Sequence, residues 1–95
     1  MSYKLTFLES AHKEWKKLAP PIRRLFKAKL EKILDNPHIP KNKLSGMNNC
    51  YKIKLRSIGY RLVYRVLNER IVVQVISIGK RDKNLVYTIA QKRLS

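Results

Sequence analysis

The chain has 95 residues, 44% of them hydrophobic, and its 22 Lys and Arg against 6 Asp and Glu give a formal net charge of +16. This length fits one small domain, the apolar content excludes a disordered basic tail, and the charge favours nucleic acid, an anionic membrane or an acidic protein as a partner. The single cysteine, Cys50, excludes an internal disulfide and indicates a reducing compartment. We find neither a signal sequence nor a membrane span, so we expect a soluble cytoplasmic protein.

The first part of the chain predicts a strand followed by two helices. Apolar and polar residues alternate over residues 3–7, as in a strand. Ser10 is the candidate N-cap of the first helix, and Pro20 ends that helix and opens the second. The apolar stripe of the second helix, which ends before Asp35, comprises Ile22, Leu25, Phe26, Ile33 and Leu34. The basic outer faces of both helices are partly offset by Glu9, Glu14 and Glu31 and read mainly as solvated surface.

Residues 36–50 read as an ordered loop, and residues 51–66 predict a β-hairpin. Ser57 and Ile58 are able to close the turn, with Gly59 supplying backbone freedom, and a loop longer by an even number of residues preserves the same pairing. The predicted cross-strand pairs are Tyr51 with Tyr64, Ile53 with Leu62, and Lys54 with Arg61.

One face of this hairpin is predicted to be apolar and the other to carry its basic side chains. No acidic residue lies between Asp35 and Glu69 to offset the cations. Like charges opposite each other destabilise a sheet, and a solvated face, which remains an alternative, normally mixes both signs. We therefore interpret this face as an anion site for a polyanion. Its members are Lys52, Lys54, Arg56, Arg61 and Arg65.

The last part of the chain predicts a third strand of the sheet and a final helix. A tight turn at Asn68 and Glu69 leads into residues 70–79, whose continuous Ile and Val content is typical of a strand buried on both faces. Asp82 is the candidate cap of the helix, and Tyr87 falls at the edge of its apolar stripe. The predicted class is α+β, with the order β-α-α-β-β-β-α in one domain over residues 1–95.

The sequence excludes several kinds of catalytic site. His12 and His38 have no metal-ligand spacing and read as surface residues, so we expect no metal. The sequence contains no glycine-rich phosphate loop, so we expect no nucleotide cofactor. The basic face fits RNA binding by cations and stacking tyrosines. It also fits RNA cleavage, in which the 2′-hydroxyl is the nucleophile. A cation about 7 Å away at an effective dielectric of about 20 lowers a lysine pKa by roughly one unit, so several cations bring Lys52 or Lys54 towards neutrality.

Three segments of the chain resemble the RelE family of toxin–antitoxin mRNA interferases. They are KLSGMNNCYKIKLRSIGYRLVYRV (residues 43–66), ISIGKRDKNLVY (76–87) and the KEWKKL helix (13–18). The resemblance implies a microbial-ribonuclease-like fold with a mostly antiparallel sheet flanked by helices. It implies metal-independent cleavage of mRNA in the ribosomal A site, which leaves a 2′,3′-cyclic phosphate and a 5′-hydroxyl. It also implies a RelB-like antitoxin that wraps the toxin, with operator DNA bound through that antitoxin.

The same resemblance implies roles for individual residues. The family's functional positions fall on Lys52, Lys54, Arg61, Arg81 and Tyr87. Lys54 or Tyr87 is then nearest to the role of general base for the 2′-hydroxyl. Arg61 stabilises charge on the scissile phosphate, and Arg81 is the candidate proton donor to the leaving 5′-oxygen. The predicted auxiliary RNA-binding residues are Lys43, Arg56, Arg65 and Lys80.

Two other functions fit the same sequence. The first is a non-catalytic module that binds RNA or the ribosome, whose affinity would fall with salt. The second is a gyrase-inhibiting toxin of the ParE type, which shares the fold and lacks the RNA chemistry. The apolar stripe of the final helix also predicts a surface that an antitoxin helix covers or displaces.

Overall fold

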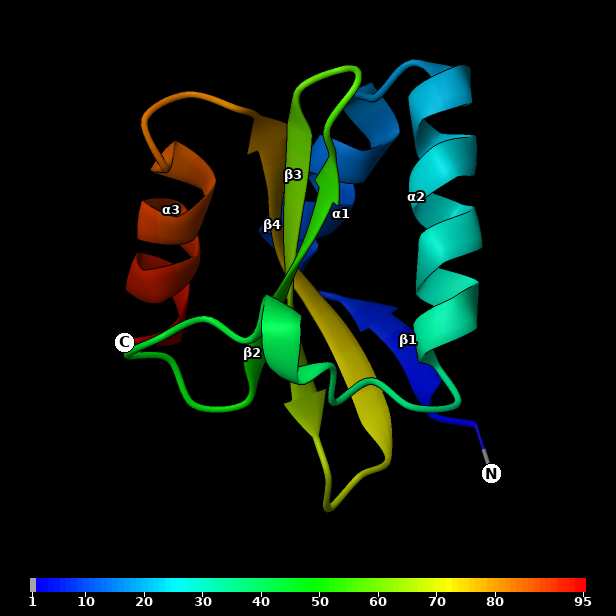
Figure 1. The fold of residues 1–95 in the computed structure, drawn as a ribbon, viewed down its shortest axis with the longest axis vertical. Coiled ribbons are helices and arrows are strands. Elements are labelled where there is room, and N and C mark those ends of the chain that lie inside the picture. The colour runs from blue at the N-terminus through cyan, green and yellow to red at the C-terminus, as the bar shows by residue number, and fades with distance from the viewer. Residues whose placement is uncertain (1) are drawn as a thin grey trace.

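The computed structural model describes residues 2–95 as a four-stranded mixed sheet with helices on both of its faces (Figure 1). The predicted order β-α-α-β-β-β-α and the α+β class are confirmed, with one short 3-10 turn (η1) added in the long loop. The elements are β1 (Lys4–Phe7), α1 (Glu9–Lys17), α2 (Pro20–Ile33), η1 (Pro40–Asn42), β2 (Cys50–Leu55), β3 (Tyr60–Leu67), β4 (Val72–Lys80) and α3 (Leu85–Leu94).

The strand order is β1-β4-β3-β2, and the sheet is mostly antiparallel as predicted. Only β1 runs parallel to its neighbour, β4. The predicted hairpin register is confirmed, since Tyr51 pairs with Tyr64 and Lys54 pairs with Arg61. The turn spans residues 56–59, two residues more than the shortest possibility, and Gly59 has a positive φ of 69°. An even lengthening keeps each side chain on its face.

The two faces of the sheet are covered differently. Helices α1 and α2 pack on the face that carries Tyr64 and form the larger hydrophobic core. Helix α3 packs on the opposite face, at the left of Figure 1, and buries Cys50 and Val63 there. The basic side chains of the hairpin lie on this second face as predicted. Helix α3 covers the middle of the face at Val63, and so separates Arg65 from the other cations.

Both predicted helix caps were wrong, because tertiary contacts set where the helices start. The N-cap of α1 is Leu8, whose N–H donates to the Val75 carbonyl oxygen at 2.9 Å, one step beyond the β1–β4 pairing. Helix α3 begins after Asn84, and Asp82 contributes only its carbonyl oxygen to a bond with Leu85 N–H at 2.8 Å. Neither helix has a side-chain cap.

The start of β4 also differs from the prediction. The turn covers residues 68–71, longer than the expected Asn68–Glu69 turn, and ends at Ile71, which has a positive φ of 55°. β4 consequently begins at Val72. In α2, Leu25 is 48% exposed and Leu30 is fully buried, so the apolar stripe is rotated from the predicted one.

Glu14 was predicted to offset cations on the outer faces of the first two helices, whereas its partner in the structure belongs to the final helix. The Glu14 carboxylate forms a 2.8 Å ion pair with Arg93 of α3 and accepts the backbone N–H of Ile78 at 3.2 Å. Arg93 also donates to the Ile76 carbonyl oxygen at 2.8 Å. β1 pairs with β4 only as far as Val75. The ion pair therefore provides hydrogen-bond partners for the backbone groups of β4 beyond that point.

His38 is not a free surface histidine either. It is half-buried, with its ring 6.1 Å from the Tyr3 ring and 6.0 Å from the Tyr51 ring. The neighbouring Pro37 carbonyl oxygen accepts the Tyr64 hydroxyl at 2.9 Å. These contacts hold the loop that leads to β2 against the sheet. Among the helices of residues 2–95, none combines the length and the apolar character that a membrane span requires.

Candidate functional site

A row of three residues crosses the sheet next to the β2–β3 turn. Lys54 of β2 pairs with Arg61 of β3, which in turn pairs with Gly79 of β4. Gly79 has no side chain, and a Cβ there would lie 3.1 Å from Cγ2 of Val86 in α3. The first turn of α3 therefore sits directly on the sheet beside the two cations of the row.

A hollow of 260 Å³ opens between this row and the end of β4. The backbone N–H of Arg81 donates to the Gly59 carbonyl oxygen at 2.6 Å, which ties the end of β4 to the β2–β3 turn. All the charged side chains of the lining are cations, so the hollow is suited to an anion. The lining residues are Lys54, Leu55, Arg56, Gly59, Tyr60, Arg61 and Arg81.

A second groove of 540 Å³ lies on the other side of Lys54, between α2 and the edge strand β2. Lys52 lines this groove, and Lys54 and Arg56 line both hollows. Lys29, Lys32 and Lys41 add three further cations to it. The two hollows share Lys54 and Arg56 and therefore form one continuous cationic surface, which suits the phosphate backbone of a nucleic acid.

The cations around Lys54 change its ionisation. They hold the pKa of Lys54 below its ordinary value, and Lys52 is the largest cause, followed by partial desolvation. Arg61, Arg56 and Arg81 lower the pKa in the same direction. The predicted coupling between neighbouring cations therefore exists at Lys54, and the neutral amine is easier to form there than in an isolated lysine.

Tyr87 lies beside the hollow, under Arg61. The Arg61 Cζ atom is 5.1 Å from the centre of the Tyr87 ring, in a cation–π arrangement. The Tyr87 hydroxyl is buried, without a hydrogen-bond partner among residues 2–95. Burial raises the pKa of Tyr87, with Arg61 acting in the opposite direction. The phenol is thus protonated at neutral pH and is not prepared to act as a base.

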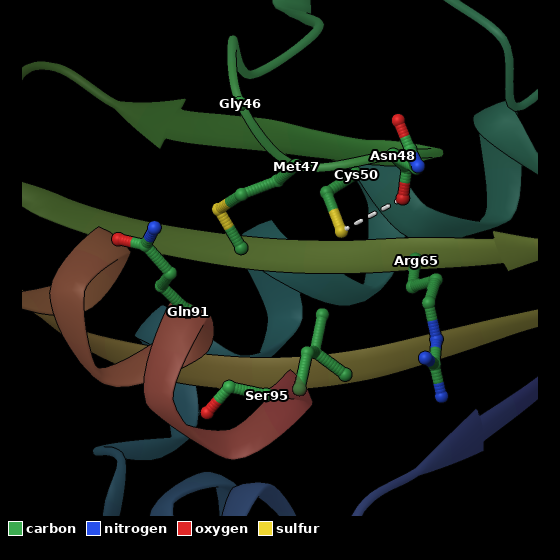
Figure 2. A pocket seen from close by; sticks show the side chains of 8 residues that line it. Gly46, Met47, Asn48, Cys50, Arg65, Gln91 and Ser95 are labelled. Carbon is green, nitrogen blue, oxygen red and sulfur yellow. Dashed lines mark hydrogen bonds between the residues drawn. The ribbon is translucent and has the colours of Figure 1, made fainter.

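The structure places Arg65 apart from the other predicted RNA-binding residues. Along β3, Arg65 is separated from Arg61 by Val63, which is buried beneath α3. The Nη2 atom of Arg65 donates to Gln74 Oε1 at 2.9 Å. Figure 2 shows Arg65 at one end of a different hollow, of 360 Å³, with Gln91 of α3 at the other. Cys50 also lines this hollow, and its thiol donates to the Asn48 carbonyl oxygen at 3.4 Å.

The remaining predicted contacts lie at the periphery. Lys80 is exposed at the end of β4 and pairs with Tyr60, so it borders the hollow. Lys43 is exposed and forms an isolated bridge to Tyr51 at the far end of β2. The structure thus brings together Lys52, Lys54, Arg56, Arg61, Arg81 and Tyr87, and leaves Lys43 and Arg65 outside.

Sequence reasoning did not identify Asn84 as a residue of the site. Its Oδ1 accepts a hydrogen bond from Arg61 Nη1 at 2.9 Å. Asn84 precedes α3 with a φ of 62°, a backbone conformation that asparagine tolerates better than most residues. An asparagine just before a predicted helix was the available signal, although it does not reveal a partner 23 residues away.

The chemistry of this set is that of a phosphate site with one ionisable base. Arg61 and Arg81 carry guanidinium donors that match phosphate oxygens, and Lys54 supplies an amine with a lowered pKa. Within residues 2–95, no three His, Cys, Asp or Glu side chains come together as metal ligands. The set therefore fits the binding of an RNA phosphate and general base catalysis on the adjacent hydroxyl.

Comparison with known proteins identifies the family. Residues 5–85 match the family profile described as the ParE toxin of the type II toxin–antitoxin system parDE. The chain is 55% identical over 94 residues, 99% of both chains, to the mRNA interferase toxin RelE of Escherichia coli K12. It superposes on the free state of a mutant E. coli RelE with a TM-score of 0.92, at 54% identity and with all of both chains covered.

A third relative was solved together with its partner. The toxin chain of the intact E. coli RelBE toxin–antitoxin complex matches with a TM-score of 0.83 at 55% identity, covering 86% of this chain and all of that one. Full-length identity of this size reaches well beyond a shared fold. The chain belongs to the ParE toxin family of type II toxin–antitoxin systems and, within it, to the RelE toxins.

Proposed function

We propose that residues 1–95 form a single RelE-like domain that cleaves mRNA in the ribosomal A site and thereby stops translation. The observation that carries this proposal is the convergence of Lys54, Arg61 and Arg81 on one cationic hollow, in which Lys52 of the adjoining groove is the largest cause of the lowered pKa of Lys54. The 55% identity to a protein named mRNA interferase toxin RelE supports it. The cytoplasm is the corresponding compartment.

In the proposed reaction, neutral Lys54 accepts the proton of the RNA 2′-hydroxyl. The 2′-oxygen then attacks the adjacent phosphorus, and the bond to the 5′-oxygen breaks. The leaving 5′-oxygen takes its proton from solvent water, so that the products are a 2′,3′-cyclic phosphate and a 5′-hydroxyl. The substrate supplies its own nucleophile, and in this proposal the cations of the site take the place of a metal. Between Lys54 and Tyr87, the raised pKa of Tyr87 favours Lys54 as the base.

The remaining residues of the site then stabilise charge and orient the substrate. Lys52 keeps the pKa of Lys54 low, and Arg61 binds the scissile phosphate. Arg81 donates a hydrogen bond to the leaving 5′-oxygen, because a guanidinium seldom gives up its proton. Tyr87 orients the RNA nucleobase by stacking. Such a set depends on positioning more than on strong acids and bases, which suits a substrate held by the ribosome.

We also propose a RelB-like antitoxin as the partner that neutralises this chain. The relative solved as the RelBE toxin–antitoxin complex supports this partner. The cationic surface suits an acidic or amphipathic antitoxin segment, and the antitoxin would carry the pair to operator DNA for repression of their own operon. Helix α3 is small, with only Val86 and Ala90 fully buried, so it is a candidate surface for that segment.

Primer extension on programmed ribosomes tests the function. We expect a cut within the A-site codon, no cut in the same RNA without ribosomes, and a loss of about a hundredfold in Arg81→Ala, the cost typical of removing one donor to a developing charge. Arg24→Ala is the matched control, because it removes one exposed arginine of α2 outside the hollow and should cut normally.

Other outcomes support the alternatives. Salt-sensitive ribosome binding without any cut indicates a binding module. The matching family profile carries the ParE name, so a DNA gyrase supercoiling assay accompanies the experiment. Inhibition of supercoiling without RNA cleavage would replace the proposal by the ParE activity.

A further inference from the structure

Asn84 connects the first turn of α3 to the cationic row of the sheet. Its Oδ1 accepts Arg61 Nη1 at 2.9 Å, and the same guanidinium lies 5.1 Å from the Tyr87 ring centre. The Asn84 carbonyl oxygen accepts the N–H groups of Tyr87 and Thr88 at 3.0 and 3.1 Å. The backbone of Asn84 is thus fixed in the helix while its side chain reaches the sheet.

Asn84 does not use its side chain as a residue at a helix start usually does. It is the N-cap of α3, where an asparagine oxygen ordinarily accepts an N–H of the first turn. Here the side chain makes no such bond, and its oxygen serves Arg61. A helix that forgoes its cap gives up local stability, and such departures from local rules concentrate at functional sites.

Electrostatics explains why Arg61 needs a neutral partner. Arg61 pairs across the sheet with Lys54, so like-charge repulsion drives the guanidinium away from the row. An amide oxygen holds the guanidinium without offsetting its charge, whereas a carboxylate would form an ion pair and weaken its attraction for phosphate. One bond to Asn84 leaves other N–H groups of the guanidinium available.

We infer that Asn84 is a positioning residue for RNA cleavage, one that holds the Arg61 guanidinium over the Tyr87 ring so that its free N–H groups meet the scissile phosphate. A donor fixed before the substrate arrives needs no reorganisation in the transition state. Asn84 itself touches no reacting atom, so its whole effect passes through Arg61. The effect of Asn84 on the cleavage rate rests on the proposed function, whereas its effect on the conformation of Arg61 does not.

The decisive variant is Asn84→Gly, because glycine keeps the positive φ without strain and removes only the amide. Asn49→Gly is the matched control. Asn49 also has a positive φ, of 59°, and lies in the loop before β2, outside the cationic hollow. Each variant is made in the wild-type chain and in Arg61→Ala, and cleavage is followed by primer extension on programmed ribosomes.

We expect Asn84→Gly to slow cleavage about threefold to tenfold in the wild-type chain, the effect of one hydrogen bond, and to cost nothing further in Arg61→Ala. Asn49→Gly should leave the rate unchanged in both chains. An equal loss from Asn84→Gly in both chains, or no loss in either, overturns the inference. If the wild-type chain cuts nothing, the proposed function fails, and NMR of the free protein still decides the positioning.

The NMR readout is the Arg61 side-chain Nε–H resonance. Because Arg61 Cζ lies 5.1 Å from the Tyr87 ring centre, we expect the ring current to shift this proton in the wild-type chain. We expect the shift to collapse in Asn84→Gly and to return in Asn84→Asp, which restores an acceptor oxygen. We also expect Asn84→Asp to raise the RNA concentration needed for half-maximal rate, since its carboxylate offsets the Arg61 charge. An unchanged Arg61 resonance in Asn84→Gly would leave Asn84 as an ordinary helix terminus.

Discussion

At the residue scale, the ionisation of Lys54 is a collective property of its neighbours. Lys52 is the largest cause of its lowered pKa, so we expect Lys52→Gln to raise the Lys54 pKa towards its ordinary value of 10.5. The rise of the cleavage rate with pH, which requires the neutral Lys54 amine, should move to higher pH with it. Titration of the lysine side-chain NMR signals measures the shift. Lys29→Gln is the control, because Lys29 lines the same groove without being a cause of the shift.

The sign of the stability effect follows from the same pKa. Because the folded-state pKa of Lys54 lies below the unfolded one, the unfolded chain binds more protons between the two values. The free energy of unfolding therefore rises with pH through that interval, up to about the ordinary lysine value of 10.5. The rise should be smaller in Lys52→Gln. An unshifted Lys54 in that variant would contradict the like-charge explanation.

At the element scale, Gly79 determines how closely α3 approaches the sheet. Gly79→Ala places a Cβ 3.1 Å from Val86 Cγ2. Overpacking costs about 1–3 kcal/mol and exceeds the gain of about 0.5–1 kcal/mol from replacing a strand glycine. We expect a net loss on the order of 1 kcal/mol in urea unfolding. Val86→Ala removes the Cγ2 atom, so adding Gly79→Ala to that variant should leave the free energy of unfolding unchanged or raise it. If Gly79→Ala costs as much in the Val86→Ala background as in the wild-type chain, the close-packing argument is wrong.

Elements with a strong repeating pattern were predictable, and their ends were not. The hairpin register followed from alternation of period two, which survives any even change in loop length. The predicted caps at Ser10 and Asp82 were wrong because the local preference for side-chain capping competed with contacts that are distant in sequence. Leu8 takes the cap of α1 because its N–H extends the pairing to β4. Asn84 was missed for the same reason, since its partner Arg61 lies on a different element.

At the scale of the whole molecule, one ion pair links the helices on opposite faces of the sheet. Glu14 and Arg93 are 79 residues apart, and no periodicity predicts such a pair. The net charge of +16 opposes the compact state, and the pairing of Glu14 with Arg93 offsets part of this repulsion where α3 meets the sheet. The cationic hollow lies at the opposite end of α3 from Arg93. Helix α3 is therefore held at both ends, by the ion pair and by the contacts of Asn84.

Loss of this ion pair should release α3 before the rest of the fold. Glu14→Gln leaves the half-buried Arg93 guanidinium without its counter-charge, and we expect a loss of about 1–3 kcal/mol in the free energy of unfolding. Hydrogen exchange should accelerate over residues 85–94 while the β3–β4 amides keep their protection. Glu31→Gln raises the net charge by the same amount from an exposed site and controls for general repulsion. Equal losses in the two variants would mean that net charge, rather than the pairing of α1 with α3, sets the stability.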